Sequence, residues 1–273
     1  EQLLDGLNDK AVNFPAALIL TDSNDSEAVR SVVDACAQAI TAKSDFGCII
    51  VVSGCSEESV QELCCSISDA IGCRCLYGHP RNAPGELAQC RRNLLELWQL
   101  RFLYVGQQVL SEKLIDACQT FAGFETKDAA PLFTALRAGQ LEEARQCWKK
   151  IFDQIRHGRF SDVRFSVRYI FKSLTALQNE LGLEPMNLAR DMLDDLEDVR
   201  MLHQTLDSVF VRIATAQDDR RKNKLGQLAA RINERISAGY ADDALSAQHI
   251  ADEMGMNAVY LGRLFRESAG ISI

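Results

Sequence analysis

The pattern of hydrophobic and polar positions separates a front part that mixes strands with helices from a back part that is helical throughout. In the front part, Ala16–Thr21 and Gly47–Ser53 are almost wholly apolar, and runs of this length are typical of buried strands. Cys73–Tyr77 is a third, shorter candidate strand. Apolar residues at helical spacing predict helices over Ser26–Ala42, from Ser56 onward, and over Pro84–Val105. Strands that alternate with helices predict an α/β or α+β sandwich.

The back part begins at about residue 125, where the strand-like runs stop. Four stretches then carry apolar residues at helical spacing: Lys127–Ala138, Leu141–His157, Asp162–Leu181 and Met186–Ala214. Glycines punctuate these stretches, so the pattern predicts a helical bundle. The charge-dense Thr215–Lys224 that follows is either a linker or a solvated helix that continues into the tail.

The tail of the chain has the pattern of an amphipathic helix followed by two short helices. Lys224–Tyr240 is the amphipathic stretch. Ser246–Met254 predicts the first short helix, with Ser246 as its N-cap, and the second begins at Asn257, another N-cap residue, and runs to about residue 268. Gly255 lies in the tight turn between them, where a positive φ is usually required.

The second short helix divides into an inner and an outer face. Leu261, Leu264 and Phe265 are spaced to point inward. The residues expected to face DNA bases are Ala258, Val259, Gly262 and Arg263, and those expected to contact the DNA backbone are Ser246, Asn257 and Arg266. Small residues permit close approach to base edges, and the forked donors of Arg263 suit the O6 and N7 acceptors of guanine. A short helix, a glycine turn and such a second helix indicate a helix-turn-helix.

The segment Asp243–Ile273 (DALSAQHIADEMGMNAVYLGRLFRESAGISI) resembles the first helix-turn-helix of the AraC/XylS family of bacterial transcription regulators. The likeness lies in the spacing "iA-x-x-x-g-x-x-x-x-YL-x-rlF" and in the closing "x-x-x-G-x-s". It implies sequence-specific binding to duplex DNA, with Val259, Gly262 and Arg263 at positions that usually face bases. Asn257 stands where the family usually has Ser, which keeps the cap. The family's DNA-binding domain has a second helix-turn-helix, and the sequence to Ile273 covers only the first, so we expect a fragment boundary there.

The upstream sequence resembles the long, YesN-type members of this family, in which a degenerate domain related to GGDEF domains follows a sensor or receiver. Glu1–Gly6 is similar to the segment after the sensor or receiver, and Cys73–Leu110 is similar to the last strand and long helix of the degenerate domain. The resemblance implies an α+β chain with three parts. These are a ferredoxin-like or GGDEF-like regulatory domain over residues 1–122, a helical linker or bundle over 123–218, and the first half of the helix-turn-helix domain over 219–273.

The same resemblance implies the setting in which the chain acts. We expect a transcription factor that takes part in signal transduction, binds double-stranded DNA as a homodimer, and has RNA polymerase as a further candidate partner. A receiver domain of the response-regulator kind, or a sensor, is expected upstream in the full-length protein. The expected location is the cytoplasm, with membrane anchoring where the upstream sensor spans the membrane.

The charge distribution agrees with a DNA contact confined to the tail. The net charge is −8, but residues 220–273 contain 8 Lys/Arg and 6 Asp/Glu, whereas residues 1–219 contain 22 and 32. A mildly basic end on an acidic body favours phosphate contacts by the end alone.

The chain carries no pattern that indicates catalysis. Its ten cysteines form no C-x-x-C pair and do not cluster with the four histidines, so we expect reduced, core-packed thiols and no metal or cofactor. Residues 15–122 contain no Gly-Gly-Asp/Glu-Glu-Phe motif, so nucleotide-cyclising chemistry is not expected. Asp22, Asp25 and Asp45 are interpreted as solvated turn carboxylates. The protein is therefore not expected to be an enzyme.

Two other functional classes stay open at this point. The front part could be a small-molecule or nucleotide-binding α/β sensory module, with the DNA-binding part incidental, or the chain could be an interaction scaffold that acts through its bundle. A short helical pair in the tail is also compatible with an αα-hairpin that only fills a core.

Overall fold

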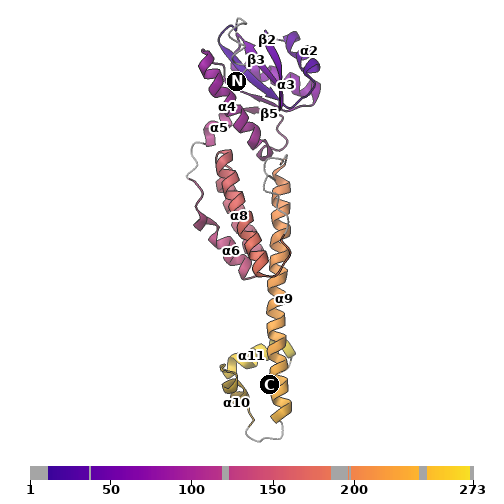
Figure 1. Ribbon diagram of the computed structural model, residues 1–273, viewed down its shortest axis with the longest axis vertical. Helices are drawn as coiled ribbons and strands as arrows, with labels where there is room; N and C mark the ends of the chain where they lie inside the picture. The colour runs from indigo at the N-terminus through magenta and orange to yellow at the C-terminus, as the bar shows by residue number, and fades with distance from the viewer. Residues whose placement is uncertain are drawn as a thin grey trace. The chain divides into compact units, whose positions relative to one another are not determined.

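The computed structural model describes residues 12–36, 38–118, 123–185, 196, 198–239 and 245–270 (Figure 1). These residues combine a five-stranded sheet near the N-terminus with a helical region that follows it, which confirms the mixed α and β composition expected from the sequence. The chain forms two compact units. The first comprises Glu1–Ala129, Trp148–Lys172 and Asn187–Leu206, and the second comprises Ala130–Cys147, Ser173–Met186 and Asp207–Ile273.

The sheet of the first unit is mostly antiparallel. Its elements are, in chain order, β1 (Ala16–Thr21), α2 (Ser26–Cys36), β2 (Ala39–Ser44), β3 (Gly47–Ser53), α3 (Glu57–Ile71), β4 (Cys75–Tyr77), α4 (Pro84–Leu100), the 3-10 turn η2 (Arg101–Leu103), β5 (Val109–Ser111) and α5 (Lys113–Ala117). The strand order is β2-β3-β1-β4-β5, in which only β4 and β5 run parallel. Ile19 in the central strand β1 lies opposite Ile50 on one side and Tyr77 on the other.

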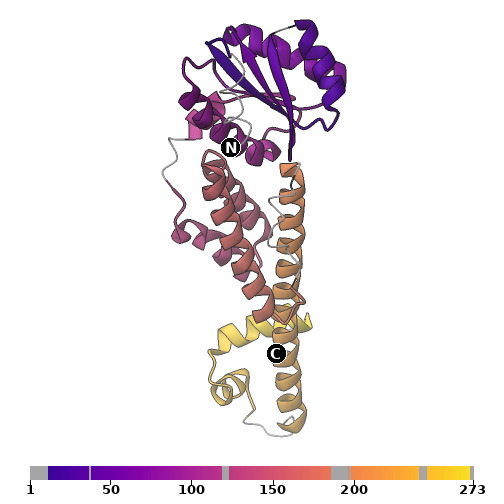
Figure 2. The same cartoon turned by 45° about the horizontal axis from the view of Figure 1, so that its top comes forward.

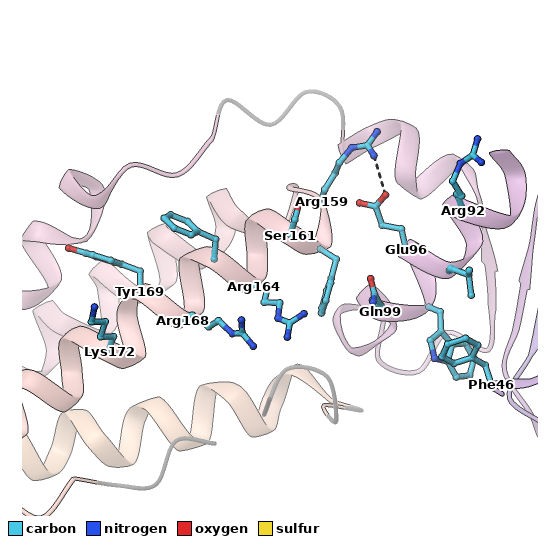
Figure 3. Close-up of a pocket in the computed structure, with 14 residues that line it drawn as sticks. Phe46, Arg92, Glu96, Gln99, Arg159, Ser161, Arg164, Arg168, Tyr169 and Lys172 are labelled. Atoms are coloured by element: carbon cyan, nitrogen blue, oxygen red, sulfur yellow. Dashed lines mark hydrogen bonds and ion pairs between the residues drawn. The ribbon is translucent and has the colours of Figure 1, made fainter. Parts of the chain in front are cut away.

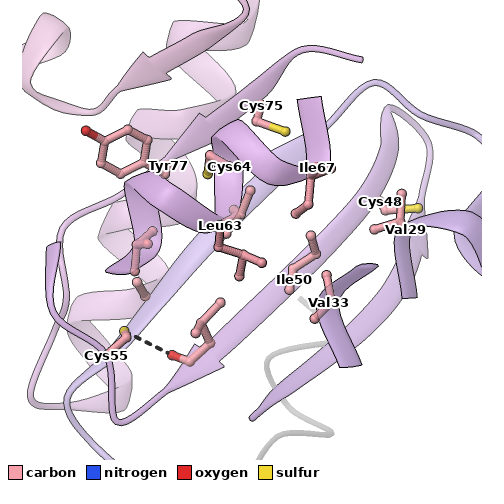
Figure 4. Close-up of a cluster of buried hydrophobic side chains, with 14 of the residues drawn as sticks. Val29, Val33, Cys48, Ile50, Cys55, Leu63, Cys64, Ile67, Cys75 and Tyr77 are labelled. Carbon is pink, nitrogen blue, oxygen red and sulfur yellow. Dashed lines mark hydrogen bonds between the residues drawn. The ribbon is translucent and has the colours of Figure 1, made fainter. Parts of the chain in front are cut away.

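Both faces of this sheet are covered by helices, which explains why its central strands are continuous apolar runs. Helices α2 and α3 cover one face and α4 covers the other (Figures 1 and 2). On the first face, Ile50 packs with Val29 of α2 and Ile67 of α3 (Figure 4). Ile19 belongs to the same cluster. Strand side chains alternate between faces, so the buried Leu18 points toward α4.

The prediction of one helix over Ser26–Ala42 is wrong at its end. Helix α2 ends at Cys36, and strand β2 follows it. Residues 39–44 instead pair with the outer edge of β3, because that edge satisfies their backbone hydrogen bonds. The strands join through a two-residue turn, and Gly47 follows with φ +130°. A Cβ at Gly47 would lie 2.1 Å from the carbonyl oxygen of Thr21, so only glycine fits there.

Two other boundaries differ from the sequence prediction. The helix predicted over Pro84–Val105 ends at Leu100 and continues only as the turn η2. Strand β4 begins at Cys75 rather than at Cys73, and β5 was not predicted at all. Strand β5 has three residues, which is too short for a periodic signal.

The helical region contains η4 (Thr126–Ala129), α6 (Ala130–Arg137), α7 (Leu141–Ile155), α8 (Phe160–Glu180), α9 (Val199–Gly239), α10 (Ala247–Glu253) and α11 (Ala258–Ala269). The predicted helices agree with these elements within a few residues up to α8. For the stretch predicted over Met186–Ala214, residues 186–195 and 197 lie outside the described residues, and the rest belongs to α9. Because α9 is continuous through Thr215–Lys224, that segment is a helix rather than a linker. None of the described helices is long and apolar enough to cross a lipid bilayer.

The cysteines pack as small apolar side chains. The nine cysteines whose side chains the structure describes are free thiols, and seven of them are buried, all in the first unit. Cys65 is exposed and Cys147 is half-buried. Burial raises the pKa of the thiols of Cys48, Cys55 and Cys118, which keeps these groups protonated and unreactive at neutral pH.

His203 of α9 lies against two aromatic residues of α7 in the first unit. Trp148 donates a hydrogen bond from Nε1 to Nδ1 of His203 at 2.9 Å, and the Phe152 ring meets the imidazole edge-on at 4.6 Å between centroids. Desolvation by this burial lowers the pKa of His203 below its usual 6.5. The negative charge of Asp153 raises this pKa, but by less than desolvation lowers it. A proton on Nδ1 would also displace the Trp148 hydrogen bond.

We expect the stability of the first unit to fall when the pH drops below about 6.5. Between 6.5 and the lower pKa of folded His203, the unfolded chain binds more protons than the folded chain, so stability is present above this window and is lost as pH falls through it. Urea unfolding at several pH values measures the effect. His203→Gln should reduce the pH dependence, whereas the same change at the exposed His157 should retain it. Identical pH dependence in wild type and His203→Gln would contradict the prediction.

Candidate nucleic-acid interface

The candidate interface is built on a small hydrophobic cluster at the end of the second unit. Three helices share this cluster, and its buried members are Ala229 and Ile232 of α9, Ile250 and Ala251 of α10, and Leu261 and Phe265 of α11. The small side chain of Ala251 is completely buried. The cluster therefore fixes α10 and α11 against the last turns of α9.

The starts of both short helices are held by the predicted caps. Oγ of Ser246 accepts a hydrogen bond from the backbone N–H of His249 at 3.2 Å. Oδ1 of Asn257 accepts from the backbone N–H groups of Val259 and Tyr260 at 2.9 and 3.3 Å. Each cap uses an oxygen as acceptor and leaves a hydroxyl or amide hydrogen that can still be donated to a phosphate oxygen.

The turn between the two helices has the conformation expected from its glycine. Gly255 has φ +64°, and the backbone N–H of Met256 donates to the carbonyl of Ala251 at 2.8 Å. A left-handed residue at this point lets α10 stop and the chain reverse toward Asn257 within three residues.

The outer face of α11 is exposed, but not at every predicted position. Val259 is 82% exposed, and Arg263 and Arg266 are also exposed. Gly262 is half-buried. Ala258 differs from the expectation, because it is half-buried and packs against the cluster, one turn before Leu261.

Two further residues of α11 have roles that the sequence pattern did not assign. Tyr260 is 46% exposed, and the guanidinium carbon of Arg263 lies 5.5 Å from the centre of its ring. The i, i+3 spacing of these residues on one helix is the signal that could have shown the pair. Leu264, expected to point inward, is only half-buried, and the inner contacts of α11 come from Leu261 and Phe265.

An exposed ion pair joins α9 to α10. The Arg235 guanidinium forms two contacts with the Glu253 carboxylate, one of them between Nε and Oε2 at 2.7 Å. Hydrogen bonding by Arg235 lowers the pKa of Glu253 and so keeps the pair charged in mildly acid solution. The charge of Glu253 is therefore neutralised by Arg235. On the outer face of α11, Arg263 and Arg266 contribute positive charge, and Glu267, whose Oε1 lies 3.9 Å from Nε of Arg263, partly offsets it.

The acids considered in the front part have local structural roles. Oδ1 of Asp22 accepts from the backbone N–H of Arg74 at 2.7 Å, and Oδ1 of Asp25 caps α2 through the N–H of Ala28 at 3.0 Å. Asp45 lies in the turn between β2 and β3. Among the described residues, no three His, Cys, Asp or Glu side chains come together in a way that could hold a metal ion.

The α9, α10 and α11 cluster thus presents one exposed helix face that carries arginines and small residues. Comparison of the chain with protein-family models, with curated proteins and with solved structures finds no match.

Proposed function

We propose that the chain is a sequence-specific, DNA-binding transcription regulator in which α10, the turn at residues 254–256 and α11 act as a helix-turn-helix. One observation carries this proposal: α11 is fixed by Leu261 and Phe265 on one side and exposes Val259 and Arg263 on the other. A rigid helix with an exposed, partly basic face is the element that enters the major groove in this class of DNA-binding proteins.

In this proposal the outer face of α11 divides its contacts between bases and phosphates. The Val259 side chain suits the thymine methyl group, and Arg263 suits the O6 and N7 acceptors of guanine. Tyr260 packs beside Arg263 and would limit the directions in which its guanidinium points. The caps Ser246 and Asn257, together with Arg266, would contact phosphates and set the position of the helix on the duplex.

Residues 1–122, which belong to the first unit, would then be the regulatory part, as a degenerate GGDEF-like or ferredoxin-like domain. Its β1-α2-β2-β3-α3-β4 order, with β1 between β3 and β4 in an antiparallel arrangement, supports this assignment. A homodimer would place two reading helices on two half-sites, and a signal from an upstream receiver or sensor would change their occupancy. RNA polymerase is a further partner in this scheme.

The test of this function is selection from a random duplex DNA library at a fixed, stated salt concentration, with the wild-type chain and three arginine variants. We expect an enriched motif for the wild type. Arg263→Ala should lose about 1–3 kcal/mol of binding free energy and relax the preference at one position of the motif. Arg266→Ala should weaken binding to all sequences without changing the motif, because a phosphate contact carries no sequence information.

Arg221→Ala, at an exposed position of α9, is the matched control and should leave both the motif and the affinity unchanged. Sequence-independent binding by the wild type, or a motif that Arg263→Ala does not alter, would contradict the proposed role of α11.

A further inference from the structure

A small pocket lies in the first unit among α7, the start of α9 and the 3-10 turn η2. Its volume is about 390 Å³, near the lower end of the range of about 300–1,000 Å³ for small-molecule sites. The groove between α4 and α8 is larger, at about 1080 Å³, but Arg92 and Lys172 lie at opposite ends of it (Figure 3). In that groove Glu96 is already paired with Arg159 at 3.1 Å. Only the smaller pocket brings its polar groups close enough together to meet one small ligand.

The walls of this pocket are apolar. Trp148 and Phe152 of α7 line it and are 5% and 6% exposed, and their ring centroids are 5.5 Å apart. Leu103 of η2 and Val199 of α9 complete the apolar lining. The Trp148 indole is held by its hydrogen bond to His203. Such walls suit a short hydrocarbon or single-ring side chain, because contact with them removes that side chain from water.

His203 adds a hydrogen-bond donor that has no partner among the described residues. Its Nδ1 accepts the hydrogen bond from Nε1 of Trp148, so the neutral imidazole carries its proton on Nε2. Desolvation lowers the pKa of His203, which keeps the ring neutral at neutral pH. None of the hydrogen bonds among the described residues uses Nε2, and His203 lines the pocket. A half-buried donor of this kind is stabilised when a ligand oxygen accepts from it.

Opposite charges lie at the mouth of the pocket. Asp153 and Arg156 are exposed residues of α7, one helical turn apart, and both line the pocket. Neither forms an ion pair with another described residue, although charges at this spacing often pair with each other. Lys149 is a further exposed cation of the same rim. A simple carboxylic acid would bring a second negative charge beside Asp153, whereas a ligand with an ammonium and a carboxylate group would neutralise both signs of charge.

We infer that this pocket binds a free α-amino acid with an apolar side chain. The side chain would pack against Trp148 and Phe152, and the ammonium group would pair with Asp153. The carboxylate would pair with Arg156 and accept the hydrogen bond from Nε2 of His203. An ammonium and a carboxylate group on one carbon atom can reach two side chains that lie one helical turn apart. If the chain regulates transcription as proposed above, the amino acid is an input signal to the first unit, but the binding itself does not depend on that function.

Isothermal titration calorimetry with the whole chain at neutral pH tests the inference. L-leucine and L-phenylalanine are the probes that carry all three features. Their N-acetyl derivatives lack the ammonium charge, the corresponding amines lack the carboxylate, and glycine lacks the side chain. We expect at least one of the two amino acids to bind. Its N-acetyl derivative, its amine and glycine should each bind at least about tenfold more weakly, because each lacks one of the three contacts.

Asp153→Asn and Arg156→Gln supply the site-specific test, and Lys150→Gln is the matched control. Lys150 is an exposed residue of the same helix that does not line the pocket. Each pocket variant should weaken binding of the better amino acid by about tenfold, and the control should not. Asp153→Asn should affect the N-acetyl derivative less, since that derivative has no ammonium charge to pair. All three positions are exposed, so no change is expected to unfold the chain, and thermal melting checks this.

Three outcomes would overturn the inference. The first is no binding of either amino acid at millimolar concentration. The second is binding that both pocket variants leave unchanged. The third is that the N-acetyl derivatives bind as tightly as the parent amino acids, which would assign the pocket to a simple carboxylic acid. None of these results bears on DNA selection by α11, so failure of this inference and failure of the proposed function are distinguishable.

Discussion

Replacing Phe265 with alanine is expected to unfold the cluster that holds α10 and α11, although Phe265 itself lies on the side away from the proposed DNA contacts. Its side chain is 2% exposed and is the largest of the six buried residues that the structure describes in this cluster. Removal of a buried phenylalanine side chain destabilises by about 3–5 kcal/mol. A core this small rarely supplies more than about 3–5 kcal/mol in total, so the loss removes most of its stability.

Hydrogen exchange measured by mass spectrometry checks this prediction segment by segment. Backbone amides of α10 and α11 should exchange about a hundredfold faster or more in Phe265→Ala, while those of β1 and β3 keep their protection, because these strands belong to the other unit. DNA selection should be lost together with the protection.

Val259→Ala is the matched control, since Val259 is on the same helix but 82% exposed. Its exchange pattern should match the wild type, because exposed substitutions usually change stability by less than about 0.5 kcal/mol. Wild-type protection of α11 in Phe265→Ala would show that the cluster does not hold the helix, and the proposed reading face would lose its physical basis.

The second large effect is expected at Glu112, a carboxylate that is 1% exposed at the end of β5. Its Oε1 accepts hydrogen bonds from Arg81 at 2.9 Å and from Asn93 at 2.6 Å, and its Oε2 accepts from the backbone N–H of His79 at 3.1 Å. Gly78 packs so closely here that a Cβ would lie 2.0 Å from Sγ of Cys90. Glu112 thus joins the loop after β4, helix α4 and the end of β5.

Glu112→Gln should destabilise the first unit by about 2–4 kcal/mol. The amide keeps the shape of the carboxylate, but its own N–H donors face the donors of Arg81, Asn93 and the His79 backbone. The substitution also removes the charge that pairs with Arg81. Labelling of thiols in increasing urea measures the effect specifically, because the seven buried cysteines lie in this unit. The labelling midpoint should move to lower urea.

Glu57→Gln is the control at the same end of the sheet. Glu57 pairs with Lys113 at 2.6 Å, but Lys113 is 63% exposed, so solvent screens this pair and its removal should have a smaller effect. Equal midpoint shifts for the two variants would contradict a structural role of the buried network around Glu112.

The local features of the fold and of the candidate site were predictable because short-range physics decides them. The strands β1 and β3 are continuous apolar runs, so their side chains are buried on both faces only where helices cover both faces of the sheet. The caps Ser246 and Asn257 and the left-handed Gly255 follow from hydrogen bonds and steric limits within a few residues. The exposure of Val259 and Arg263 follows from helical spacing relative to Leu261 and Phe265.

The tertiary structure alone decided the features that depend on partners far along the chain. Residues 39–44 form a strand because β3 offers an unpaired edge, and β5 is a strand because β4 lies beside it. Ala258 turns partly inward because α9 and α10 reach that side of α11. The Glu112 network joins segments that are tens of residues apart. The periodicity of one segment carries no information about such contacts, since they depend on which other segment folds against it.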